Sequence, residues 1–150
     1  MIIYLDCDGT WIDLYGVENW LEYLRNEDTF PYEAARPLVN LSLLARTIHQ
    51  LQAKGIKVGV ISWLCKGGKK EYNAAVTEAK LKWFKRHLPS VTFDEVHIVN
   101  YGTPKHTCAT HENAILFDDE ERNRKEWKGI ALDEKDLIKN MRSYLKKVIA

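Results

Sequence analysis

The chain has 150 residues, of which 45% are hydrophobic and 29% are charged, and its formal net charge at pH 7 is +1. These values are typical of one soluble globular domain with a sizeable core. So small a net charge excludes a general electrostatic attraction to nucleic acid or to a membrane surface, so any basic recognition surface must be local.

No apolar run is long enough to span a bilayer, and the first residues lack the basic, apolar and small-residue regions of a secretory signal. We therefore expect a cytoplasmic protein without a membrane partner. The three cysteines, Cys7, Cys65 and Cys108, are far apart and have no C-x-x-C spacing, which favours reduced thiols over a disulfide framework or a zinc site. The sequence gives no indication of the oligomeric state.

The first predicted element is a strand over residues 2–5, because four consecutive apolar residues are typical of a strand covered on both faces. The strand ends at Asp6 and Asp8, and Gly9 supplies a flexible exit. Side chains two positions apart on a strand point the same way, so these carboxylates can share one pocket, whereas Cys7 should face away and pack in the core. Carboxylates held close need a shared proton or a cation such as Mg²⁺. The alternative is an acidic pair that caps a helix or ends a turn.

Two helices are predicted between the first and second strands. Apolar residues recur at helical spacing over 17–25, and a longer helical pattern runs over 33–54 until Gly55 ends it. Because Pro37 lies in the first turns of the longer pattern, its start is expected near Ala35.

From residue 56 onward, strands and helices alternate. Strands are predicted at 56–62, 95–99, 114–117 and 129–132, and helices at about 71–87, at 120–127 and from the cap Asp133 to residue 145. Thr103 is predicted to cap a further helix that starts at Pro104. Alternating strands and helices imply a single α/β domain over 1–150, with a five-stranded parallel sheet flanked by helices in a three-layer, Rossmann-like fold.

Polar residues stand where four of these strands end or the next helix begins. They are Asp6 and Asp8 after the first strand, Ser62 as the last residue of the second, Lys105 after the third, and Asp118 with Asp119 after the fourth. Ligands bind at this edge in open α/β sheets. Taken alone, each has a simpler explanation: a helix cap for Ser62, a solvated charge for Lys105 and a helix N-terminal pair for the last two acids.

Together and in this order, these residues resemble the motifs of the haloacid dehalogenase superfamily of phosphatases and phosphotransferases. The resemblance covers nearly the whole chain: D-x-D-G-T at Asp6 to Thr10, an apolar strand ending in Ser62, Lys105 at the opening of a later helix, and a strand ending in Asp118 and Asp119. The sequence is also similar to small uncharacterised members found among phages and bacteria. In this superfamily the insertion after the first strand forms a cap, which here would be a small helical segment at about 11–36.

The resemblance implies that Asp6 attacks the phosphoryl group to form an aspartyl-phosphate, and that Asp8 protonates the leaving oxygen and then deprotonates the attacking water. It implies Mg²⁺ held by Asp6 and Asp119, with Asp118 nearby and the backbone carbonyl of Asp8 as a further ligand. Asn123, one helical turn after Asp119, is expected to orient that acid. Phosphate binding is implied for Ser62, Lys105 and Thr10.

Two stretches are candidates for substrate contact. The segment after the first strand is rich in aromatic residues that could stack on a base or sugar, Trp11 among them, although the helical spacing of Trp20 favours the core. In the loop after the second strand, Trp63 lies near Lys66 and Lys69, which could receive a nucleotide or a nucleic-acid end, or could form a solvated loop.

The acid at Asp8 favours phosphate-ester hydrolysis, because superfamily members that remove halogens or pump ions typically lack it. The predicted function is a Mg²⁺-dependent phosphomonoester hydrolase acting on a nucleotide or another small phosphorylated metabolite. The alternatives are a polynucleotide 3′-end phosphatase and a catalytically weak module that binds phosphate or nucleic-acid ends. A binding module would have no need of an acid at position 8.

Overall fold

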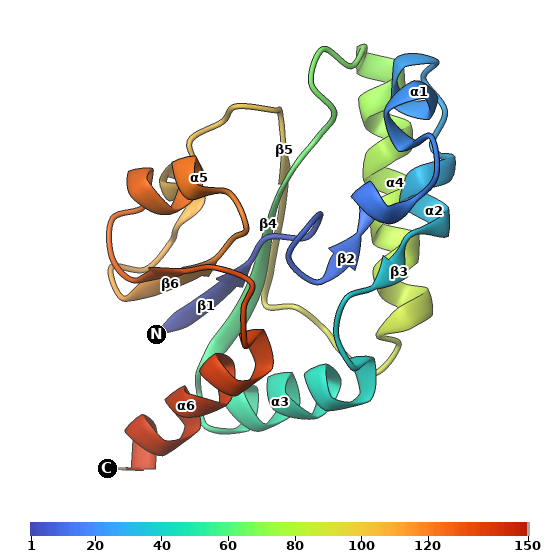
Figure 1. The fold of residues 1–150 in the computed structure, drawn as a ribbon. Coiled ribbons are helices and arrows are strands. Elements are labelled where there is room, and N and C mark those ends of the chain that lie inside the picture. The colour runs from blue at the N-terminus through green and yellow to red at the C-terminus, as the bar shows by residue number, and fades with distance from the viewer. Residues whose placement is uncertain (150) are drawn as a thin grey trace.

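The computed structural model describes residues 1–149. Five strands form one parallel sheet in the order β5-β4-β1-β6-β7 (Figure 1). Their bounds are β1 Ile2–Leu5, β4 Lys57–Trp63, β5 Glu95–Val99, β6 Ala114–Phe117 and β7 Ala131–Leu132. The predicted α/β class and five-stranded parallel sheet are therefore confirmed.

Helices and loops cover both faces of the sheet. On one face, Ile3 and Leu5 pack with apolar residues of α3 (Leu41–Ala53) and α6 (Leu137–Ile149), which lie side by side (Figure 1). On the other face, Ile2 and Tyr4 pack with Trp127, which directly follows the short helix α5 (Glu121–Glu126). Because β1 is buried on both faces, its residues are apolar throughout, as the absence of alternation predicts.

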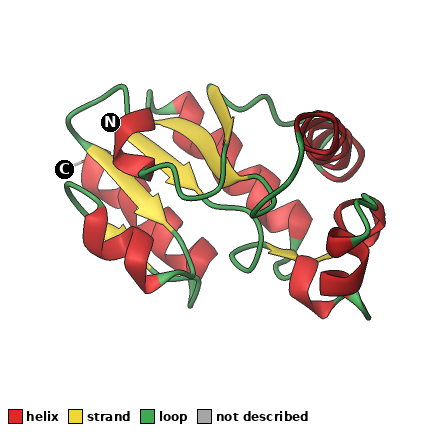
Figure 2. Cartoon of the chain, turned by 90° about the horizontal axis from the view of Figure 1, so that it is seen from above, coloured by secondary structure: helices red, strands yellow, loops and turns green. Residues whose placement is uncertain are grey.

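The segment between β1 and α3 forms a small subdomain, which we call the insertion (residues 12–37). It contains β2 (Ile12–Asp13), a 3₁₀ turn (Leu14–Gly16), α1 (Trp20–Arg25), α2 (Phe30–Ala34) and β3 (Arg36–Pro37), and β2 pairs with β3 antiparallel. Its Leu14 and Tyr32 pack against residues of α4 (Lys70–His87). In Figure 2, α4 stands beside the short helices of the insertion, away from the strands of the sheet. The insertion corresponds to the segment predicted at about 11–36, and its action as a cap stays a proposal.

The long helix predicted over 33–54 is wrong in its first part. Pro37 pairs with Ile12 in the small antiparallel ladder, and α3 starts only at Leu41. The side chain of Asn40 caps α3 by accepting a hydrogen bond from the Leu43 backbone N–H at 3.0 Å. Pro37 has no N–H group to donate within a helix, and Asn40, three positions later, is a good N-cap residue. Together they move the start of α3 to Leu41.

Two smaller predictions also need correction. The segment at Lys105–Cys108 is a single 3₁₀ turn preceded by Pro104, and the Thr103 hydroxyl donates backwards to the Asn100 carbonyl instead of capping it. No residue of α1 is fully buried, so Trp20 is not a core residue.

Among the described residues, no helix has both the length and the apolar character needed to cross a bilayer.

Candidate active site

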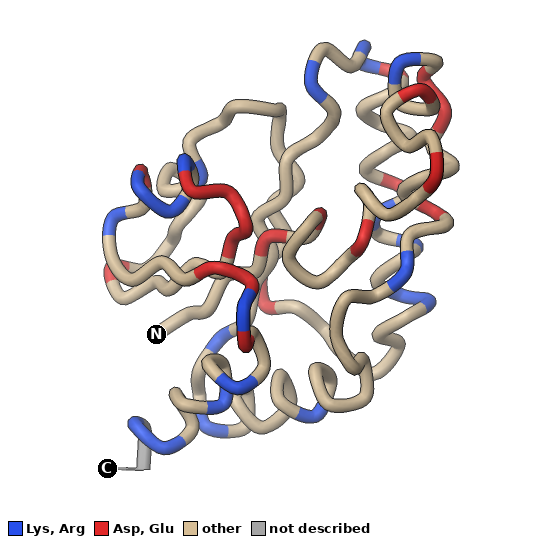
Figure 3. Tube along the Cα trace, in the orientation of Figure 1, with Lys and Arg blue, Asp and Glu red and all other residues tan. Residues whose placement is uncertain are grey.

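Three carboxylates meet where β1 and β6 end. These strands are neighbours in parallel register, with Leu5 opposite Phe117, so Asp6 emerges beside Asp118 and Asp119. One oxygen from each of these three acids lies within 4.8 Å of the others. Figure 3 shows the acidic positions after the two strands close together at the centre of the molecule. Sheet register thus brings together acids more than 100 residues apart in the chain.

A buried lysine joins two of these acids. Lys105 Nζ lies 2.6 Å from Asp6 Oδ1 and 2.8 Å from Asp118 Oδ2, and its side chain is 2% exposed. Burial opposes the charge of this lysine, but the two carboxylates hold its pKa above the usual value. Burial also opposes the charge of Asp6 and by itself would raise the pKa of this acid. Lys105 and neighbouring hydrogen bonds outweigh burial and bring the pKa of Asp6 below the usual value. Asp6 is therefore ionised at neutral pH, as a nucleophile must be.

Asp118 and Asp119 differ in their remaining surroundings. Asp118 accepts hydrogen bonds from the Glu120 backbone N–H at 2.9 Å and from Asn123 Nδ2 at 3.0 Å. The prediction that Asn123 orients Asp119 is thus wrong, because it binds the preceding acid. Burial and the nearby carboxylates of Asp6 and Asp118 raise the pKa of Asp119 to about 8.

The three acids of the cluster could together hold a metal ion. Among the described residues, the three acids have ion pairs with one ammonium, that of Lys105, which contacts Asp6 and Asp118 but not Asp119. The raised pKa of Asp119 reflects this excess of negative charge. Within the described chain, Asn123 Oδ1 is buried without a hydrogen-bond partner and belongs to a residue that lines the adjacent cavity. A divalent cation would compensate the excess charge, and oxygen ligands of this kind fit Mg²⁺.

Gly9 allows Asp119 to approach the end of β1. Its φ of +86° is in the left-handed region, and a Cβ added there would overlap the Asp119 carboxylate. We expect Gly9→Ala to weaken Mg²⁺ binding by about tenfold or more, because it displaces a predicted ligand. Gly55→Ala is the matched control, since Gly55 has a φ of +81° but no atom within 4 Å of an added Cβ.

Both glycine variants should lose about 1 kcal/mol of unfolding free energy through backbone strain. Only Gly9→Ala should lower Mg²⁺ affinity, measured by titration calorimetry. Equal Mg²⁺ affinity in the two variants would contradict this placement of Asp119.

Asp8 lines the same cavity as Asp6, but its carboxylate is outside the acid cluster. Its Oδ2 accepts a hydrogen bond from Lys80 Nζ at 2.9 Å. Burial raises the pKa of Asp8 more than Lys80 lowers it, so the pKa stands above its usual value, which suits a proton donor. Lys80 was not predicted; its only signal is helical spacing, which places it on the same face as the buried residues Val76 and Phe84.

Thr10 and Ser62 hold other site residues. The Thr10 hydroxyl donates to Asp6 Oδ2 at 2.9 Å and accepts from the Asp119 backbone N–H at 3.2 Å. Ser62 Oγ accepts from Lys80 Nζ at 2.6 Å. Both side chains are almost fully buried, and binding of a phosphoryl oxygen by either one stays a prediction.

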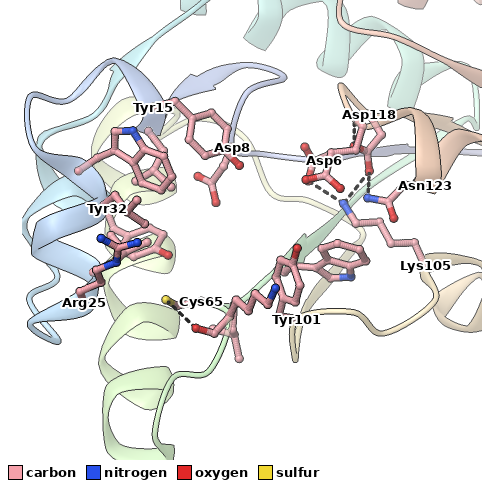
Figure 4. A pocket seen from close by; sticks show the side chains of 18 residues that line it. Asp6, Asp8, Tyr15, Arg25, Tyr32, Cys65, Tyr101, Lys105, Asp118 and Asn123 are labelled. Carbon is pink, nitrogen blue, oxygen red and sulfur yellow. Dashed lines mark hydrogen bonds and ion pairs between the residues drawn. The ribbon is translucent and has the colours of Figure 1, made fainter.

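A cavity of about 440 Å³ opens beside the acids. In Figure 4, Tyr15, Tyr32 and Arg25 lie on one side of it and Lys105 and Asp118 on the other, with Asp6 and Asp8 between the two sides. The insertion and the loop after β4 supply most of the cavity wall. Its aromatic lining residues are Tyr15, Trp20, Tyr32, Trp63 and Tyr101.

The predicted substrate contacts divide into two groups. Trp63 and Lys66 line the cavity, where the Trp63 ring contacts the Tyr101 ring with centroids 4.9 Å apart. Lys69 is outside this lining; its side chain is 77% exposed and pairs with Glu27 at 3.8 Å. Trp11 is a core residue stacked on aromatic rings of the main cluster, which corrects the prediction that it contacts substrate.

Comparisons with known proteins identify the fold. No protein-family model matches the chain, and no curated protein matches its sequence. Among solved structures, it is similar to the crystal structure of D,D-heptose 1,7-bisphosphate phosphatase from Burkholderia thailandensis, with a TM-score of 0.57 and 14% sequence identity. The match covers 96% of this chain and 97% of that chain. The protein therefore has, over nearly its full length, the fold of a known phosphatase.

Proposed function

We propose that this protein is a Mg²⁺-dependent phosphomonoester hydrolase of the haloacid dehalogenase superfamily, acting on a nucleotide or another small phosphorylated metabolite. The observation that carries the proposal is the position of Asp6, an ionised carboxylate that lines the cavity, pairs with buried Lys105 and lies within the acid cluster. The fold shared with a phosphatase supports it.

The chain's own residues account for the two steps of hydrolysis. Asp6 attacks the phosphorus atom, and the ester oxygen leaves with a proton from Asp8. Asp8, now ionised, then accepts a proton from the water that cleaves the aspartyl-phosphate. Lys105 keeps Asp6 ionised and oriented for the first step through its 2.6 Å contact, and it stabilises the carboxylate that the second step regenerates.

Mg²⁺ would be held by Asp6, Asp118 and Asp119, together with the backbone carbonyl of Asp8. When bound, it supplies positive charge between the attacking carboxylate and the phosphoryl oxygens, which otherwise repel each other. The crowding of these acids supports this assignment.

The cavity wall favours a substrate with an aromatic group. Aromatic side chains can stack on a base, and Arg25 and Lys66 add positive charge on the wall. A nucleoside monophosphate meets these features. A polynucleotide 3′-end is the second candidate, because Lys66 lines the cavity and Lys69 and Lys70 follow it closely in the chain.

The proposal is tested by release of inorganic phosphate from a panel of nucleoside monophosphates, sugar phosphates, a sugar bisphosphate and a 3′-phosphorylated oligonucleotide. We expect release with Mg²⁺ that stops with chelator, and fastest turnover of a nucleoside monophosphate. Preference for the oligonucleotide would favour the second candidate. Binding without release of phosphate from any substrate would favour the catalytically weak binding module.

Mg²⁺ affinity should depend on pH. The pKa of Asp119 is about 8, because this acid is buried beside other carboxylates, so a cation must displace a proton there. Affinity should therefore rise as the pH increases toward about 8 and become constant above it. Titration calorimetry in buffers of different ionisation enthalpy measures both affinity and proton release.

Asp119→Asn is the matched control for this pH dependence. It should lower Mg²⁺ affinity by about 10- to 100-fold and remove most of the proton release. Affinity that is constant over the same pH range in the unchanged protein would contradict the assignment of Asp119 as a ligand.

A further inference from the structure

A second buried lysine lies beside the site without lining the cavity. Lys80, on α4, is 4% exposed, and its Nζ donates to Asp8 Oδ2 at 2.9 Å, to Ser62 Oγ at 2.6 Å and to the Trp63 carbonyl at 2.9 Å. An ammonium group has three N–H donors and no acceptor. All three donors of Lys80 are therefore used, and two go to side chains at the active edge, Asp8 in the loop after β1 and Ser62 near the end of β4.

We propose that Lys80 is a positioning residue of the phosphatase reaction, which holds the Asp8 carboxylate and the Ser62 hydroxyl in their reactive orientations. This inference rests on the proposed function. Lys80 acts through Asp8 and Ser62 and is not itself expected to touch the substrate.

Packing alone gives no reason for a lysine at this position. Position 80 lies one helical turn from Val76 and from Phe84, both buried, and burying a charge costs free energy that an apolar side chain would avoid. Lys80 Nζ also lies 5.3 Å from the centre of the Tyr32 ring of the insertion. The lysine thus connects the end of β4, the loop after β1 and the insertion, which are the three parts that surround the reacting groups.

The donor pattern decides which atoms remain available for the reaction. Because Asp8 Oδ2 accepts from Lys80, Oδ1 is the oxygen left to serve the leaving group. Because the ammonium can only donate, Ser62 Oγ must accept from it, which leaves the Ser62 hydroxyl hydrogen available for a phosphoryl oxygen. Without Lys80, both groups would be free to rotate.

The test compares two substrates that differ in their need for a general acid. The nitrophenolate of p-nitrophenyl phosphate leaves without a proton, whereas the alkoxide of benzyl phosphate needs one. In Lys80→Met, kcat/KM for benzyl phosphate should fall about 100-fold, and that for p-nitrophenyl phosphate by less than about tenfold, which is the part lost through Ser62 on both substrates. Lys82→Met is the control and should leave both values unchanged, because Lys82 is 75% exposed and pairs with Glu78 on the same helix.

The ratio of the two losses separates positioning from packing. A smaller fraction of folded protein lowers both values equally, so equal losses on the two substrates would overturn the inference. If the unchanged protein releases phosphate from neither of these esters and from no substrate of the panel above, the proposed function fails instead.

A double variant covers the case in which Lys80→Met does not fold. Asp8→Asn/Lys80→Met leaves no unpaired buried carboxylate and is compared with Asp8→Asn alone. If Lys80 acts through Asp8 and Ser62, the added change should lower kcat/KM for benzyl phosphate by less than about tenfold, because only the part that acts through Ser62 is left to lose. A further loss of about 100-fold in this background would overturn the inference.

Discussion

Asp6→Asn is expected to lower phosphate release by a factor on the order of 10⁴ or more, because the amide cannot attack phosphorus. The same change should alter the unfolding free energy by less than about 2 kcal/mol. Asparagine keeps an oxygen that can accept a hydrogen bond from Lys105, and that lysine keeps its ion pair with Asp118. Loss of activity without loss of fold is the signature of a nucleophile.

The measurement is phosphate release at saturating Mg²⁺, with thermal unfolding of the same samples. Asp13→Asn is the control, since Asp13 lies on β2, outside both the acid cluster and the cavity lining. It should retain the activity of the unchanged protein. Turnover by Asp6→Asn within tenfold of that activity would exclude Asp6 as the nucleophile.

Lys105→Met is expected to reduce both activity and stability. Its ammonium is the counter-charge of Asp6 and Asp118, and their side chains are 10% and 1% exposed. Removing one partner of a buried ion pair costs about 3–5 kcal/mol of unfolding free energy, because the remaining charges are uncompensated. Loss of this positive charge beside the attacking carboxylate should lower kcat by about 100- to 1,000-fold.

Denaturant unfolding with and without Mg²⁺ tests this explanation. Because Mg²⁺ would compensate the same carboxylates, it should restore more stability to Lys105→Met than it adds to the unchanged protein. Lys125→Met serves as control, since Lys125 is 74% exposed and pairs with Glu121 on the surface. Equal stability of the two variants without Mg²⁺ would show that Lys105 does not neutralise the acids.

The sheet could be predicted from the sequence because its central strands carry continuous apolar runs. Residues 2–5 and 114–117 are buried throughout, and each run ends at acids that the parallel register brings together. The elements near Pro37 could not be predicted in the same way. Apolar periodicity continues across that segment, and only the ladder with Ile12 and the cap at Asn40 reveal where α3 starts.

The site could be predicted only in part, because tertiary packing decides the roles of several residues. Trp11 follows the acids directly in sequence, yet its ring packs between α4 and Phe93 in the core. Lys80 has no sequence signal apart from its helix face, and its role depends on the neighbouring strand ends. Contacts between segments far apart in the chain are not visible in local patterns.

In the proposed reaction, Asp6 is the residue that receives the phosphoryl group. Asp8→Asn should form the aspartyl-phosphate from p-nitrophenyl phosphate but hydrolyse it slowly, since it lacks the base for the second step. The measurement is the burst of nitrophenolate, with mass spectrometry of the acid-quenched protein. We predict one phosphoryl group per chain, on the peptide that contains Asp6, and none in Asp6→Asn/Asp8→Asn. A phosphoryl group on another residue, or a burst without any attached phosphoryl group, would contradict the account.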